Sequence, residues 1–92
     1  MTSPKFDLGR VVATPGALAL MEQYNVSPQV FLTRHVSGDW GDMDAEDKAH
    51  NDAALASGEE RIFSAYIVGS EKIWVITEWD RSVTTLLLPE DY

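Results

Sequence analysis

The sequence contains no cysteine, which excludes disulfides, thiolate chemistry and any zinc site built on cysteine. Long hydrophobic runs are also absent: the apolar runs are only a few residues long, whereas a helix that spans a bilayer needs about 20. The opening MTSPKFDLGR has no apolar stretch of the kind found in secretory signals. We therefore expect a cytoplasmic protein that does not engage membranes.

Basic residues are scarce as well. Seven Lys and Arg residues stand against fifteen Asp and Glu residues, so the formal net charge is −8. Such a chain repels phosphate backbones, and we expect no non-specific binding to nucleic acid. A basic protein surface would instead attract it. The 92 residues are 45% hydrophobic and contain no repeat or linker, which predicts one domain over 1–92 with a flexible lead-in at 1–8.

The run GDWGDMDAEDKAHND, residues 38–52, concentrates the negative charge. Its six carboxylates, against a single Lys, are Asp39, Asp42, Asp44, Glu46, Asp47 and Asp52. The run is a solvated helix-capping face, a cation site or a surface for a basic partner. Asp42, Asp44 and Glu46 have the spacing that opens an EF-hand calcium loop. However, Asp47 stands where that loop needs Gly and Ala53 where it needs Glu, so a solvated face is favoured and partner recognition ranks second.

The two histidines, His35 and His50, raise the question of a zinc site because carboxylates are near both in the sequence. The spacing that places two histidines on one helical face beside a glutamate is absent. His35 is close to Phe31 and Leu32, which favours a partly buried packing role with hydrogen bonds. We expect no metal site and no cofactor.

Local signals predict the secondary structure. Thr14-Pro15 and Ser27-Pro28 both match a helix start, because the hydroxyl accepts from free amides and proline needs no donor. After Gly58 the hydrophobic period changes from about 3.6 residues to 2. We expect helices at 15–24, 28–36 and 44–57, a short strand at 9–13, and strands at 61–68, 72–79 and 83–88.

This order of elements predicts an α+β fold: short helices followed by a three-stranded antiparallel meander, or four strands if 9–13 joins it. The helices would pack on one face of the sheet. For the third helix we expect the small side chains to face inward, because they recur at helical spacing and permit close approach. These are Ala45, Ala49, Ala53 and Ala56.

Three strings of the sequence, GRVVATPGAL, HVSGDWGDMDAEDKAHND and KIWVITEWDRSVTTLLLPEDY, carry a resemblance to a known group. The chain resembles, from Gly9 onward, a family of small bacterial proteins described as plasmid-related or hypothetical, some with a restriction-subunit label. GDWG and ITE-x-DRS-x-TT-x-LLPE-x-Y are its specific motifs, and this chain has Trp79 where members often have Ala. The resemblance implies a bacterial cytoplasmic protein associated with mobile elements, and it implies no catalytic residues.

One enzymatic alternative uses His35, Glu78 and Arg81. Metal-independent RNA cleavage needs a general base, a phosphate clamp and a general acid, and these roles suit Glu78, Arg81 and His35 respectively. Helices followed by an antiparallel sheet also match the layout of barnase-like and RelE-like nucleases, which is an analogy of fold only. The small number of basic residues argues against RNA binding. A turn with a surface ion pair around Arg81 is the favoured interpretation.

The tryptophans offer candidate contacts for a partner. Trp40 lies between Gly38 and Gly41 in the acidic run, and packing onto the core is favoured over exposure as an interface anchor. Trp74 and Trp79 should point to opposite faces of their strand, so one of them is exposed if helices cover a single face.

The sequence therefore predicts a non-enzymatic interaction protein that engages a basic protein surface, with a ribonuclease as the alternative. A concrete form is the modulation or inhibition of a system that handles nucleic acids, through mimicry of nucleic-acid charge. Homodimerisation is compatible with the sequence. The predicted partner-binding residues are Asp39, Trp40, Asp42, Asp44, Glu46, Asp47 and Trp79.

Overall fold

The structure is a computed structural model that describes residues 4–92. Its elements follow the order β1 (Arg10–Ala13), α1 (Pro15–Gln23), α2 (Pro28–Val36), α3 (Ala45–Ser57), β2 (Ile62–Val68), β3 (Glu71–Thr77), β4 (Val83–Leu87) and the 3₁₀ helix η1 (Pro89–Asp91). Every predicted helix and strand is present, and residues 61–88, all of which the structure describes, contain no helix. The α+β fold class is confirmed.

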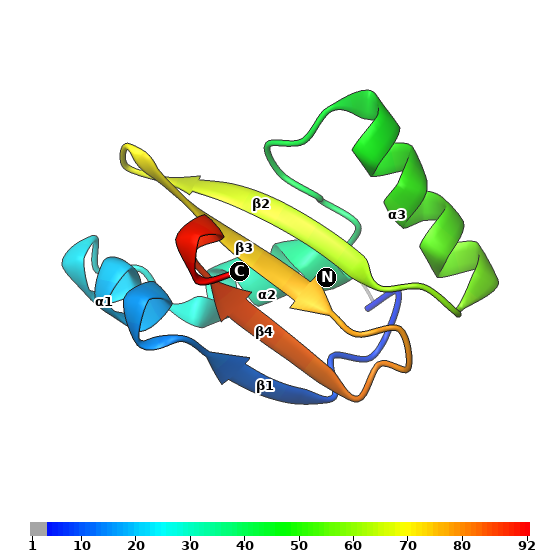
Figure 1. The fold of residues 1–92 in the computed structure, drawn as a ribbon, viewed down its shortest axis with the longest axis horizontal. Coiled ribbons are helices and arrows are strands. Elements are labelled where there is room, and N and C mark those ends of the chain that lie inside the picture. Colours follow the sequence, from blue (N-terminus) through cyan, green and yellow to red (C-terminus); the bar gives the residue numbers. More distant parts are fainter. Residues whose placement is uncertain (1–3) are drawn as a thin grey trace.

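The sheet has the strand order β1-β4-β3-β2 (Figure 1). β2, β3 and β4 form the predicted antiparallel meander. β1 joins it as a fourth strand, but parallel to β4, with Val11 opposite Thr84. The sheet is therefore mixed and not wholly antiparallel. A helix follows β1 directly at Pro15, so β1 has no hairpin turn that could pair it with the next strand.

The helix starts confirm the local signals. The Thr14 side chain accepts a hydrogen bond from the Ala17 amide, and the Ser27 side chain accepts from the Gln29 amide. Asp44 caps α3 by accepting from the Asp47 amide at 2.8 Å. Gly58 ends that helix at φ 69°, in the left-handed region that glycine adopts at no steric cost. In residues 4–92, no helix is both long and apolar enough for a bilayer.

The main core lies between the sheet and the helices α1 and α2. Figure 1 shows α2 behind the sheet and the C-terminal η1 in front of it. The core residues are Ala17, Leu20, Met21, Phe31, Leu32, Tyr66, Val68, Ile73, Val75 and Leu86. α1 and α2 thus cover one face as predicted, whereas α3 packs along the outer edge of β2 through a second cluster around Ala54 and Ile62.

The predicted inner face of α3 is wrong. Its alanine stripe is exposed at all four positions, Ala45, Ala49, Ala53 and Ala56. The buried residues are Asn51 and Ala54, with Leu55 half-buried. Alanine has little surface to remove from water, so the stripe specifies the rotation of the helix only weakly. The larger Leu55 and the hydrogen bonds of Asn51 determine it.

Residues 5–8 of the predicted flexible lead-in contact the rest of the fold. The Lys5 amide donates to the Val36 carbonyl at 2.8 Å. The Phe6 ring meets the His35 ring edge-on, with centroids 5.1 Å apart. The Leu8 carbonyl accepts from the Thr84 hydroxyl at 2.7 Å. These contacts join the segment to α2 and β4, and residues 1–3 of the predicted lead-in lie outside the described residues.

Candidate functional site

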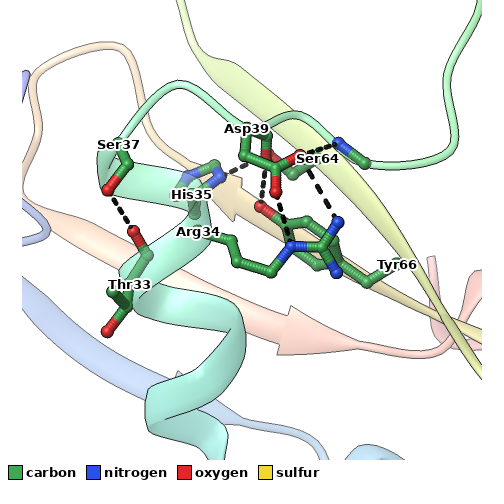
Figure 2. A network of polar contacts seen from close by, with 8 residues as sticks. Thr33, Arg34, His35, Ser37, Asp39, Ser64 and Tyr66 are labelled. Atoms are coloured by element: carbon green, nitrogen blue, oxygen red, sulfur yellow. Dashed lines mark hydrogen bonds and ion pairs between the residues drawn. The ribbon is translucent and has the colours of Figure 1, made fainter.

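His35, the predicted general acid of the enzymatic alternative, is completely buried at 0% exposure. Its Nδ1 atom lies 2.6 Å from the Ser64 hydroxyl on β2, and its Nε2 atom lies 2.9 Å from the Thr77 hydroxyl on β3. Figure 2 shows the imidazole reaching from α2 toward Ser64. Both ring nitrogens are thus used inside the protein, which agrees with the predicted packing role.

The chain of hydrogen bonds continues from His35 through Thr77 and Thr84 to the Leu8 carbonyl, which can only accept, so the donor of each bond can be assigned from that end. The Thr84 hydroxyl donates to the Leu8 carbonyl, so the Thr77 hydroxyl must donate to Thr84, 2.7 Å away. Nε2 of His35 must then donate to Thr77, which leaves Nδ1 to accept from Ser64. The histidine is therefore held as the Nε2–H tautomer.

Burial lowers the pKa of His35 to about 3, because a charged imidazolium loses its hydration in this site. The ring is neutral near pH 7 and has no surface through which a substrate could reach it. A general acid must be protonated and within reach of the leaving group. His35 meets neither condition.

Arg81 is bound to the protein's own main chain. Its guanidinium donates to four carbonyl oxygens, those of Ala54, Glu60, Glu78 and Trp79, at 2.6–3.2 Å. Its backbone is in the left-handed region at φ 60°, which a non-glycine residue adopts only when its surroundings compensate. Arg81 ties the β3–β4 loop to the C-terminal end of α3. Both of its terminal nitrogens already donate to main-chain carbonyls, whereas a phosphate clamp would direct them to the ligand.

Arg81 also borders a groove of about 730 Å³ between the lead-in and α2. The apolar side chains of its lining are those of Pro4, Phe6, Leu8, Leu32 and Val36. Neither His35 nor Glu78 lines the groove. The three residues of the enzymatic alternative therefore do not share this cavity.

The acidic run is exposed, as predicted: Asp39, Asp42, Asp44, Glu46 and Asp47 all face solvent. Asp39 pairs with Arg34, whose Nε donates to the carboxylate at 2.7 Å (Figure 2). This hydrogen bond is the main reason that the pKa of Asp39 is lowered. The Tyr66 hydroxyl donates to the Asp39 carbonyl at 2.7 Å, and Arg34 stacks over the Tyr66 ring.

Three other acids of the run also have structural partners. Asp42 pairs with Lys72 of β3 at 2.9 Å, Asp44 caps α3, and Asp52 accepts from the Trp40 indole at 3.1 Å. Within residues 4–92, no hydrogen bond or ion pair engages the carboxylates of Glu46 and Asp47. The same residues contain no group of three or more His, Cys, Asp or Glu side chains placed to hold a metal ion.

The two tryptophans predicted to bind a partner differ in their surroundings. Trp40 is 4% exposed and packs with Ala54 and Ile62, so it belongs to the core and offers no surface. Trp79 is 61% exposed. Arg81 holds the β3–β4 loop, which contains Trp79, against the C-terminal end of α3. Asp44 caps the other end of this helix, which is about 20 Å long.

Sequence reasoning missed Asn51. Its side chain binds both main-chain groups of Phe63 at the outer edge of β2, donating to the carbonyl at 2.6 Å and accepting from the amide at 3.1 Å. In the sequence Asn51 stands between the polar residues His50 and Asp52, which is typical of a surface position. Among the described residues 4–92, the structure thus offers an exposed acidic surface on α3 and does not bring His35, Glu78 and Arg81 together in the groove that Arg81 borders. No protein-family model, curated protein or solved structure matches the chain.

Proposed function

We propose that the protein is a non-enzymatic interaction module that engages a basic protein surface through α3. The exposure of this helix carries the proposal. Of its thirteen residues, only Asn51 and Ala54 are buried and Leu55 is half-buried. A helix held by one narrow line of contacts leaves the rest of its surface available to a partner.

The negative charge on this surface indicates that the partner has a basic surface. Asp44, Glu46 and Asp47, here called the acidic turn, surround the first turn of α3, and Lys48 is the only Lys or Arg in the helix. Glu46 and Asp47 support the proposal most directly, because their carboxylates are exposed and the fold does not use them as it uses Asp44. The exposed negative charges of the acidic turn steer a basic protein toward this end of α3.

The bacterial family that the chain resembles suggests the biological setting. Association with mobile elements is consistent with a protein that modulates or inhibits a host system for handling nucleic acids. Basic surfaces are common in such systems because they bind phosphate. In this proposal, the acidic turn imitates the charge of nucleic acid.

The proposal can be tested with basic proteins selected by their chemistry. A heparin-retained fraction of bacterial proteins would be passed over the immobilised protein, with duplex DNA as competitor. The variant Glu46→Lys/Asp47→Lys should lose capture by about tenfold or more, because two repulsive charges replace two attractive ones. DNA should compete with the protein for the captured partner.

A matched control reverses two charges elsewhere. Glu22 on α1 and Glu71 on β3 are exposed, so Glu22→Lys/Glu71→Lys changes the net charge equally and should retain capture. Equal loss in both variants would mean that only net charge matters and would reject the acidic turn as the site. If the purified protein cleaves RNA and the Glu78→Ala variant does not, the ribonuclease alternative is supported instead.

A further inference from the structure

The two edge strands of the sheet, β1 and β2, differ in whether their outward main-chain groups have hydrogen-bond partners. At the β2 edge, Asn51 binds the main chain of Phe63. The next outward residue, Ala65, donates to the Trp40 carbonyl and accepts from the Asp42 amide. Strand edges attract other strands unless they are covered, and these contacts cover most of β2.

The β1 edge has no comparable cover. The Arg10 amide donates to the carbonyl of Ser82, which precedes β4, and the Thr14 amide donates to the carbonyl of Leu86 in β4, so both point into the sheet. Main-chain groups alternate along a strand, so the amides and carbonyls of Val11 and Ala13 point outward. No hydrogen bond from another described residue reaches them. Figure 1 shows β1 at one edge of the sheet, and the Val11 side chain is 43% exposed.

We propose that β1 pairs antiparallel with β1 of a second copy, so that two four-stranded sheets become one. The register is limited at both ends. Gly9 bends the chain at φ 65°, and Pro15 has no amide to donate. Pairing Val11 with Ala13 of the second copy is the register in which all the outward groups of both strands find partners.

This register is also complementary in charge. It places the exposed Arg10 opposite Thr14 of the second copy. The Thr14 hydroxyl donates to the Asp91 carboxylate at 2.7 Å, so Arg10 meets Asp91 of the other copy, twice per dimer. Within one chain, Arg10 lies at one end of β1 and Thr14, which binds Asp91 of η1, follows the other end, about 10–13 Å away. The same surface thus supplies both partners, as a two-fold interface requires.

Sedimentation velocity of the full chain over a wide concentration range tests the pairing. Interfaces this small are weak, and we expect a monomer–dimer equilibrium with a dissociation constant on the order of 0.1 mM. Val11→Pro removes an outward amide and leaves the β4 ladder intact, so it should raise that constant about tenfold or more. Ile67→Pro makes the same change at the β2 edge and should leave it unchanged.

A charge exchange provides a second test if Val11→Pro does not fold. Arg10→Asp and Asp91→Arg should each weaken the dimer, and the double variant should restore it, because only the pairing between copies brings these residues together. A wild-type protein that stays monomeric at about 1 mM would overturn the proposal. The proposal would also be overturned if the dimer persisted in Val11→Pro or if Ile67→Pro weakened it equally. A double variant that does not restore the dimer would have the same consequence.

Discussion

The side-chain amide of Asn51 takes the place of a neighbouring strand for Phe63. Its nitrogen donates to the Phe63 carbonyl at 2.6 Å, and its oxygen accepts from the Phe63 amide at 3.1 Å. Asn51 is 1% exposed, so both bonds are shielded from water. This pair determines which side of α3 faces the sheet and explains why the alanine stripe is outside.

Replacing Asn51 by Leu should destabilise the protein by about 2–4 kcal/mol, because the two buried main-chain groups of Phe63 lose their partners. Ala49→Leu, on the exposed side of the same helix, should change stability by less than about 0.5 kcal/mol. Urea unfolding monitored by circular dichroism measures both. A large loss from Ala49→Leu would mean that the alanine stripe packs inward after all.

Elements whose signals are local could be predicted from the sequence, and relationships between distant residues could not. Thr14-Pro15, Ser27-Pro28 and Gly58 mark helix ends within a few residues, and the structure confirms them. The parallel pairing of β1 with β4 joins segments some 70 residues apart. The exposure of the acidic run followed from the cost of burying unpaired carboxylates.

The candidate site shows the same division. The apolar neighbours of His35 predict its partial burial, but its partners Ser64 and Thr77 are 29 and 42 residues away in the chain. Nothing local indicates that they converge. The main-chain role of Arg81 was also missed, because a charged residue in a turn looks the same whether it faces solvent or binds four carbonyls.

Stability at alkaline pH should depend on Tyr66, whose pKa is raised to about 12, chiefly by burial. An unfolded tyrosine ionises near pH 10, so the unfolded state releases its proton first and stability falls between pH 10 and 12. The loss at pH 11 should be about 1.4 kcal/mol. Tyr66→Phe should abolish this component, whereas Tyr92→Phe should keep it; urea unfolding at pH 8 and pH 11 compares them.

Arg81→Lys should destabilise the protein by about 2–3 kcal/mol even though the charge is retained. An ammonium group cannot reach the four carbonyls that the guanidinium serves. Arg61 is a matched control, because it is exposed and its guanidinium stacks 5.6 Å from the centre of the Tyr92 ring. Arg61→Lys should cost less than about 1 kcal/mol. Similar melting temperatures for the two variants would contradict the role assigned to Arg81.

Acid should destabilise the protein through His35. Its pKa is about 3 in the folded protein and about 6.5 in an unfolded chain. Between these values the unfolded state binds a proton that the folded state does not, so the stability present above pH 6.5 is lost as the pH falls. The contribution should reach about 3 kcal/mol at pH 4.

Two variants separate this effect from the titration of carboxylates. His35→Gln can still donate to Thr77, so it should fold with reduced stability at pH 7 and show a shallower loss between pH 6.5 and pH 4. The exposed His50 is the other histidine of the chain, and His50→Gln should keep the wild-type slope. Guanidinium unfolding at several pH values gives the slopes, and nitrogen NMR of His35 should show a proton on Nε2 and none on Nδ1. An equal slope in wild type and His35→Gln would show that the buried ring is not the acid-sensitive group.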